Sequence, residues 1–227
     1  MHIVGFILVP LIAIFMGLLF LGLFRKVMAR IQWRYGPPIT QPVIDIIRLL
    51  SQKTVTHGFI FEFGLILSLA GSLVVVLFLP LGNIVLLESG GLLLILYLML
   101  LSPLGIALSS GEAANPNASI GISRKFLLAL GYEVPLLLVL LTVMSYYNTI
   151  SLSEIVKMQS TQGWSFGSLP LFLSGIAYFM ILPAILGVRP FEIAGAAQEI
   201  SSGPMVEYGG KFLAFSHIHH GLQEFIG

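Results

Sequence analysis

The chain has 227 residues, of which 57% are hydrophobic and only 9% are charged, and its formal net charge is +1. Soluble domains carry about 25% charged residues, so this composition excludes an ordinary soluble protein. Apolar runs of about 18 residues or more recur along the whole length, which predicts an all-α protein that crosses a membrane several times. Cysteine is absent, so the chain forms no disulfide and holds no cysteine-ligated iron–sulfur cluster.

We expect a single membrane domain over residues 1–227, with five complete spans and a sixth that the end of the chain cuts off. The expected spans cover residues 3–24, 59–79, 92–109, 126–146, 169–188 and, in part, 212–227. At about 1.5 Å per residue, each complete run can cross about 30 Å of hydrocarbon. The first run lacks the flanking features of a signal peptide, so we interpret it as a retained span.

Lysine and arginine are distributed very unevenly among the expected loops. Ten of the eleven fall in the first, third and fifth loops, residues 25–58, 110–125 and 189–211, and only Lys157 lies elsewhere. Basic residues are retained on the cytoplasmic side of cell membranes. We therefore expect a multi-pass cell-membrane protein with these three loops in the cytoplasm and the N-terminus outside.

The first loop contains a predicted amphipathic helix. Gly36 and Pro37 turn the chain, and Pro42 suits the first turn of the helix that follows. One face of this helix is apolar and the other polar. The apolar face contains Val43, Ile46, Ile47 and Leu50, and the polar face contains Asp45, Arg48 and Gln52. Such a helix lies at the membrane surface, either as an anchor or as a docking shelf for a cytoplasmic partner.

Glu133 is an ionisable residue inside the fourth expected span. It lies about two turns from the third loop, in otherwise apolar sequence, and Pro135 leaves the Gly131 carbonyl without its helical partner. Ionisable groups at this depth are costly and usually face a bundle interior or a wet cavity. Two interpretations stay open: a carboxyl that exchanges protons, and a carboxyl that only fixes helix packing.

The fifth loop gathers three of the ten acidic residues at the end of a membrane span: Glu192, Glu199 and Glu207. A solvated connecting loop and a functional acidic site both explain this composition.

The last segment contains three histidines, His217, His219 and His220, followed by Glu224. This pattern alone is weak support for a metal site, and an interfacial or proton-relay role is the stronger interpretation. The sequence contains no Gly-rich phosphate loop or Ser-His-Asp set, and no surface typical of nucleic-acid binding.

Four motifs follow one another in a fixed order over about 180 residues. They are Arg34-Tyr-Gly-Pro, Gln41-Pro-x-x-Asp45-x-x-Arg48-Leu, Gly131-Tyr-Glu133, and Pro190-Phe-Glu192 through Gln198-Glu199 to Glu207-Tyr208-x-Gly210. Together they resemble the membrane subunit of respiratory complex I that lines the quinone chamber, and its relatives in energy-converting membrane-bound hydrogenases and sulfane reductases. The order and spacing make the resemblance more specific than any single motif.

The resemblance implies a subunit without a redox centre that passes protons or strain between a cytoplasmic redox module and antiporter-like membrane subunits. It assigns proton transfer to Glu133, Glu192, Glu199 and Glu207. The implied interface with the redox module contains Arg30, Arg34, Asp45, Arg48 and Arg189. Iron–sulfur clusters and, as an option, a nickel–iron centre are expected in the partner subunits; no metal or cofactor is expected in this chain.

Two positions depart from the complex I pattern, which has Pro-Phe-Asp followed by Leu-Pro-Glu-Ala-Glu. Gly195 and Ala197 stand where that pattern has acids, and the Ser123-Arg124 segment is more similar to the hydrogenase branch. The resemblance therefore implies a ferredoxin-linked, ion-translocating complex that evolves hydrogen or reduces sulfur, and argues against quinone binding. Three alternatives remain: a quinone-chamber subunit, a passive anchor, and a secondary transporter, for which we find no inverted repeat.

Overall fold

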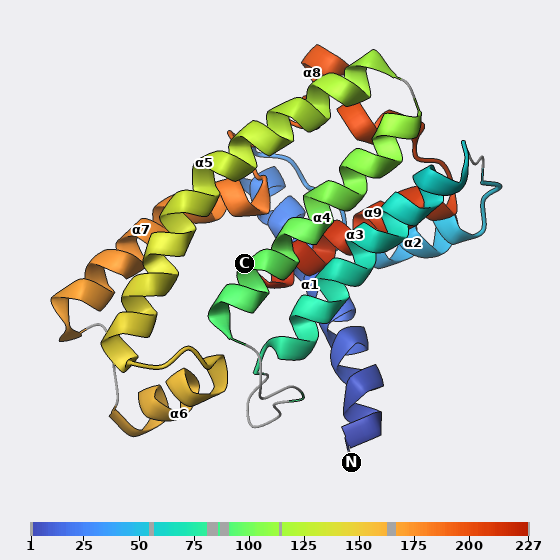
Figure 1. Cartoon of the computed structure of the whole chain (residues 1–227). Coiled ribbons are helices and arrows are strands. Elements are labelled where there is room, and N and C mark those ends of the chain that lie inside the picture. Colours follow the sequence, from blue (N-terminus) through green and yellow to red (C-terminus); the bar gives the residue numbers. More distant parts are fainter. Residues whose placement is uncertain are drawn as a thin grey trace.

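A computed structural model describes residues 2–54, 57–80, 86, 91–113, 115–162 and 167–226, and these ranges are almost entirely helical (Figure 1). The elements are α1 (His2–Ile31), α2 (Gln41–Leu50), α3 (Phe59–Phe78), α4 (Leu92–Glu112), α5 (Pro116–Tyr147), α6 (Leu152–Gln162), α7 (Leu169–Leu186), α8 (Ala197–Ile200), the 3-10 helix η2 (Gly203–Glu207) and α9 (Lys211–Ile226). An isolated antiparallel bridge joins Gly91 to Ser151.

Five of the described helices are long and apolar enough to cross a membrane, and they match the five complete spans that the sequence predicts. These are Gly5–Ile31, Phe59–Phe78, Leu92–Glu112, Pro116–Tyr147 and Leu169–Leu186. The expected partial sixth span is the helix α9. The predicted all-α, polytopic architecture is therefore confirmed.

Helical residues extend beyond two of the expected spans. Helix α1 continues to Ile31, beyond the expected end at residue 24, because no residue before Gln32 breaks it; the turn comes at Trp33, whose φ is +57°. Helix α5 begins at Pro116, so residues 116–125 of the expected third loop are helical. The side chain of Asn115 accepts a hydrogen bond from the Asn117 amide at 2.9 Å, which caps this helix. A further helix, α6, lies between the fourth and fifth expected spans.

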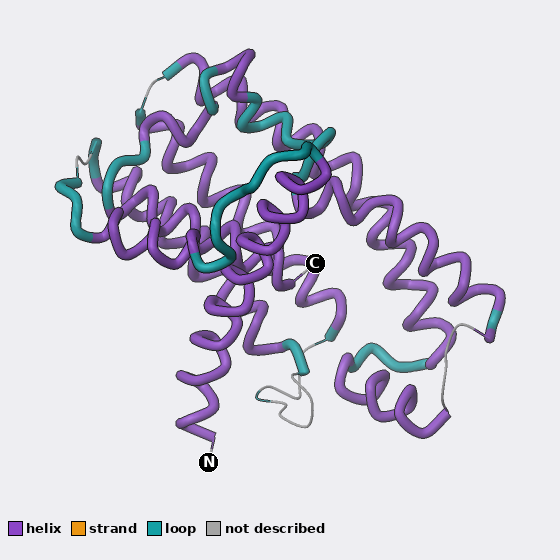
Figure 2. Tube along the Cα trace, turned by 180° about the vertical axis from the view of Figure 1, so that it is seen from behind, coloured by secondary structure: helices purple, strands orange, loops and turns teal. Residues whose placement is uncertain are grey.

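The spans form two groups, which meet where α4 packs against α5. Helix α3 packs mainly against α4, and α5 packs against α7, while α9 packs against both α1 and α3. The N-terminus and α6 lie at one end of the molecule and α8 lies at the other (Figure 1). Figure 2 shows from behind that α1 projects from the bundle at the N-terminal end. The N-terminus and α6 therefore share one end, as alternating spans require, while the end that faces the cytoplasm stays a prediction.

Glycines bring the central helices unusually close together. A Cβ atom on Gly105 of α4 would lie 2.4 Å from the carbonyl oxygen of Gly64 in α3, and one on Gly17 of α1 would lie 2.0 Å from the carbonyl oxygen of Gly221 in α9. Both distances are far below van der Waals contact, so only glycine permits these crossings. Small residues at such contacts are typical of membrane helix pairs, because packing drives association there.

Helix α2 forms as expected and buries two of the four residues of its apolar face. Ile46 is buried and Val43 half-buried against residues of α1 and α9. Ile47 and Leu50, which the sequence places on the same apolar face, are 64% and 41% exposed. Part of the predicted apolar face thus packs against α1 and α9, and Ile47 and Leu50 of the same face stay free for the membrane surface.

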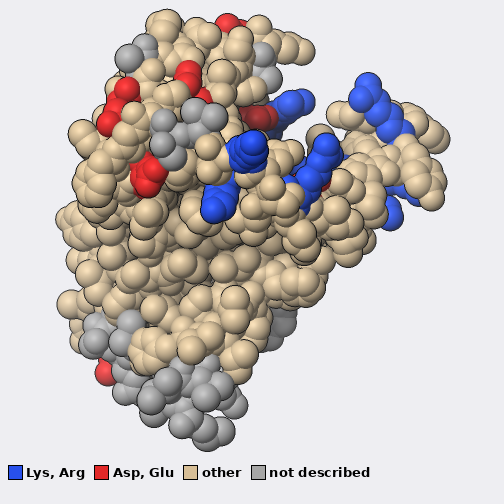
Figure 3. All heavy atoms as spheres, turned by 90° about the vertical axis from the view of Figure 1, so that its right-hand side faces the viewer, with Lys and Arg blue, Asp and Glu red and all other residues tan. Residues whose placement is uncertain are grey.

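Charged side chains collect at one end of the molecule. In Figure 3 the basic and acidic atoms gather over the upper part of the face, and a broad band below them is free of both apart from an acidic side chain at the opposite end. An uncharged band between polar ends is the surface that a bilayer covers.

Candidate functional site

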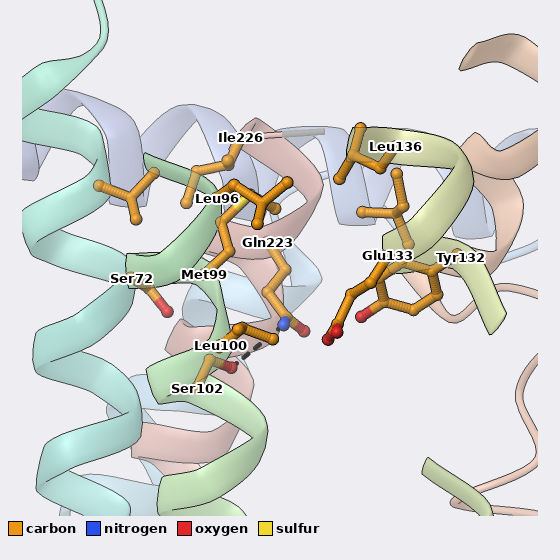
Figure 4. A pocket seen from close by; sticks show the side chains of 12 residues that line it. Ser72, Leu96, Met99, Leu100, Ser102, Tyr132, Glu133, Leu136, Gln223 and Ile226 are labelled. Atoms are coloured by element: carbon orange, nitrogen blue, oxygen red, sulfur yellow. Dashed lines mark hydrogen bonds between the residues drawn. The ribbon is translucent and has the colours of Figure 1, made fainter. Parts of the chain in front are cut away.

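Glu133 lies on α5 and lines a pocket whose other walls come from α3, α4, α7 and α9 (Figure 4). The polar residues that line it are Tyr132, Glu133, Ser72, Ser102 and Gln223; the rest are apolar. In Figure 4 the carboxyl of Glu133 and the side-chain amide of Gln223 point toward one another. The cavity volume is about 40 Å³, which exceeds the roughly 10–15 Å³ that one water needs.

A buried hydrogen-bonded line runs from this pocket into the bundle. The Gln223 amide donates to Ser102 Oγ at 3.2 Å, and Ser102 Oγ lies 2.8 Å from His219 Nε2. On the other side of the ring, His219 Nδ1 lies 2.7 Å from Ser72 Oγ. The sequence showed the histidine run, but Ser72, Ser102 and Gln223 are residue types that carry no signal of their own. Only the packing of α3, α4 and α9 brings them together.

A second cavity, of about 200 Å³, adjoins the Glu133 pocket and leads to the fifth loop. Tyr132, Ile185 and Gln223 line both cavities, and Glu192 lines the second. The shared lining residues therefore connect the Glu133 pocket to the fifth loop. Gly195, one of the two positions that depart from the complex I pattern, also lines this second cavity.

A third and larger cavity, of about 630 Å³, continues from the second toward the first loop. Glu192 and His220 line both the second and the third cavity. Three arginines also line the third: Arg25, Arg34 and Arg189. The three cavities therefore form an adjoining row from the charged end of the molecule to Glu133.

The four acidic residues assigned to proton transfer do not form one group. Glu133 and Glu192 line adjoining cavities, whereas Glu199 and Glu207 line none of the three. Glu199 is exposed and pairs with Arg124 at 2.7 Å, an arrangement that contributes little to stability. Glu207 accepts a hydrogen bond from Asn115 at 2.6 Å and lies 3.1 Å from His57.

An aromatic cluster fixes the end of the fifth loop beside Glu207. The ring of Phe61, which is fully buried, makes edge contacts with Tyr208 and Phe212 at centroid distances of 5.5 and 5.3 Å. Burial raises the pKa of Tyr208 above its ordinary value, so its hydroxyl stays protonated, 3.3 Å from Ser110 Oγ. These contacts anchor the loop to α3 and α4 independently of the three cavities.

The residues of the expected partner interface have different surroundings. Asp45 lies 3.9 Å from Arg25, so its charge is partly matched within the chain. The Arg30 guanidinium lies over the Tyr35 ring, 5.1 Å from its centroid. Arg34 and Arg48 are exposed, and the Arg189 side chain is 82% exposed although it contacts Glu192. Within the described ranges, no three His, Asp or Glu side chains are grouped so as to hold a metal ion.

The sequence and the fold are similar to those of known proteins. The family model described as NADH dehydrogenase matches residues 3–226. Hydrogenase-4 component C of Escherichia coli (strain K12) is 31% identical over 216 residues, which are 92% of this chain and 67% of that protein. A subunit of the NADH-quinone oxidoreductase of Protochlamydia amoebophila (strain UWE25) is 33% identical over 215 residues, 84% of this chain and 65% of that protein. The chain thus spans about two thirds of the length of these curated relatives.

A solved structure is also similar over nearly the whole chain. A chain in the structure of the membrane-bound sulfane sulfur reductase, an archaeal respiratory membrane complex, superimposes with a TM-score of 0.94 and 42% identity. The alignment covers 98% of this chain and 74% of that one.

Proposed function

The chain belongs to the NADH dehydrogenase family, and from that premise we propose that it is the non-redox membrane subunit of a ferredoxin-linked, ion-translocating respiratory oxidoreductase. The complex evolves hydrogen or reduces sulfur. In this proposal the chain anchors a cytoplasmic redox module and couples electron transfer there to the movement of protons or sodium ions. Iron–sulfur clusters and, in the hydrogen-evolving case, a nickel–iron centre belong to the partner subunits.

The observation that carries the proposal is the row of three cavities from the charged end to Glu133. A carboxyl within an apolar span is costly, and such groups usually face a wet cavity and mark an ion path. Glu192 lines two of the three cavities and Glu133 lines the innermost. A passive anchor needs neither a row of cavities nor an acid at its inner end.

The relatives support the hydrogen-evolving or sulfur-reducing branch. The chain in the sulfane sulfur reductase is 42% identical, whereas the relative from the NADH-quinone oxidoreductase is 33% identical. The fifth loop supports the same branch, because a Cβ atom on Gly195 would lie 3.6 Å from a carboxyl oxygen of Glu192. An acid at residue 195 would therefore add negative charge directly beside Glu192, and this chain lacks it.

One observation favours a second function. The outermost cavity is large enough for a small molecule and has three arginines in its wall. A quinone-chamber subunit of an NADH dehydrogenase-like complex would use such a space. We rank this function second because Gly195 and Ala197 replace the acids of the complex I pattern.

The surfaces suit two kinds of partner besides the bilayer. Arg30, Arg34, Arg48 and Arg189 present positive charge for a cytoplasmic redox module, and Trp33 beside them is 98% exposed. The outer faces of α5 and α7 are apolar and exposed, with Leu127, Phe179 and Met180 among their residues. We assign these faces to lipid and to antiporter-like membrane subunits.

Glu133→Gln tests the proposal. Glutamine keeps nearly the same shape but cannot ionise, and proton transfer by a positioned side chain is worth about 10²–10⁴-fold. The purified variant complex, reconstituted in vesicles, should therefore assemble and transfer electrons but build no ion gradient. Glu154→Gln on α6, at the opposite end of the molecule, is the matched control and should behave like the parent. Normal gradient formation with normal coupling in Glu133→Gln would mean that this carboxyl only fixes packing.

A further inference from the structure

The buried line through His219 has a defined hydrogen-bond direction. The ring is 4% exposed and bridges α3 and α4 from α9, with Ser72 on one nitrogen and Ser102 on the other. The Ser72 hydroxyl also donates to the carbonyl oxygen of Ser68 at 3.1 Å. A hydroxyl has only one proton to donate, so while Ser72 donates to Ser68 it accepts from His219.

This direction fixes the tautomer of His219. Nδ1 carries a proton and donates to Ser72, and in a neutral ring Nε2 then accepts from the Ser102 hydroxyl. Ser102 uses its one proton in the hydrogen bond to the ring, and its oxygen accepts a hydrogen bond from the Gln223 amide nitrogen. Every group in the line thus has one consistent role when His219 is neutral.

Gln223 lies between this line and Glu133. One of its two N–H groups donates to Ser102, and the amide faces the Glu133 carboxyl across the pocket (Figure 4). Two acceptors facing each other are unfavourable unless one carries a proton. A neutral His219 is therefore compatible with a protonated Glu133, whose carboxyl can donate to the Gln223 oxygen.

The opposite set of hydrogen-bond directions also gives every group in the line a partner. If His219 carries protons on both nitrogens, Nε2 donates to Ser102, Ser102 donates to the Gln223 oxygen, and the Gln223 amide turns its nitrogen toward an ionised Glu133. Both states satisfy the same groups, and they differ by one proton, which has left Glu133 and reached His219.

We propose that Gln223, Ser102 and His219 form a proton relay that exchanges one proton between Glu133 and His219. Glu133 gives its proton to a water in the pocket, that water gives one to Ser102, and Ser102 passes its own proton to His219 Nε2. The Gln223 amide keeps its protons and rotates. Ser102 lines the pocket, so such a water can reach it. The relay rests on the proposed function and extends it beyond the glutamates to a proton acceptor at the contact of α3, α4 and α9.

His219→Gln separates a proton-accepting role from a structural one. A glutamine side chain can donate to Ser72 and accept from Ser102, as the neutral ring does, but it cannot take up a proton. In the vesicle-reconstituted complex we expect gradient formation to slow about 100-fold. His217→Gln, on the same helix but outside the line, is the control and should match the parent. Normal gradient formation in His219→Gln would overturn the relay.

Infrared difference spectra of the same complexes give an independent measure. The carboxyl band of Glu133, identified by its loss in Glu133→Gln, should weaken during turnover in the parent and stay constant in His219→Gln. A band that still weakens in His219→Gln would overturn the relay. If His219→Gln does not assemble, Gln223→Met carries the test, with the same expected loss and the same contrary result.

The two proposals fail in different ways. If Glu133→Gln builds a normal gradient, both the proposed function and the relay are refuted. If Glu133→Gln builds none while His219→Gln builds a normal one, only the relay falls.

Discussion

Gly105→Ala should loosen the contact between α3 and α4 and break the line through His219. The new Cβ atom would lie 2.4 Å from the Gly64 carbonyl oxygen, 2.5 Å from the Ser68 amide nitrogen and 2.8 Å from the Ser68 side chain. Ordinary contacts of a Cβ atom begin near 3.4 Å. The backbones of the two helices must therefore separate by about 1 Å, since the atoms that collide are mostly backbone.

The cost has two parts. Forcing an extra carbon into a tight contact costs about 1–3 kcal/mol. His219 bridges the two helices through bonds of 2.7 and 2.8 Å, and a separation of about 1 Å stretches one of them beyond hydrogen-bonding range. Leaving a buried polar group unpaired costs about 1–3 kcal/mol more. The expected loss is thus about 2–6 kcal/mol.

Gly111→Ala on the same helix is the matched control, because no atom lies within 4 Å of a Cβ atom built there. Alanine in a helix gains about 0.5–1 kcal/mol over glycine, so this variant should be at least as stable as the parent. The assay heats each purified complex and measures the intact fraction by size-exclusion chromatography. Gly105→Ala should lose its intact fraction at a clearly lower temperature than Gly111→Ala. Equal thermal profiles would refute the packing argument.

Two further predictions concern sidedness and the electron carrier. Cysteine placed at Arg30, Arg124 or Arg189 should react with an impermeant thiol reagent only from the cytoplasmic side, because ten of the eleven basic residues lie in alternate loops; labelling of any one from outside would overturn the topology. The purified complex should turn over with ferredoxin, since Gly195 and Ala197 lack the acids of the complex I pattern. Quinone-dependent turnover that is blocked by substitutions in residues 189–211 would contradict this expectation.

The candidate site was predictable only in part. Glu133 stands out in the sequence because a carboxyl in an apolar run needs an explanation, and the structure places it in a pocket that four other polar side chains also line. Glu192, Glu199 and Glu207 lie within sixteen consecutive residues (192–207), yet only Glu192 lines the row of cavities. The turns around α8 and η2 direct Glu199 toward Arg124 and Glu207 toward His57. Spacing along an irregular loop does not indicate direction, whereas spacing along a helix does.

The sequence by itself determined the elements that depend on local composition. Long apolar runs fixed the number of complete spans, and Pro42 marked the start of α2. Helix α5 begins at the Asn115-Pro116 pair, ahead of the span predicted from residue 126. The tertiary structure alone decided which faces meet. Glycines at residues 64 and 105 let α3 and α4 approach, and α9 inserts His219 between Ser72 and Ser102. Serine and glycine occur everywhere in membrane spans, so their significance depends on the partner that packing brings within hydrogen-bonding distance.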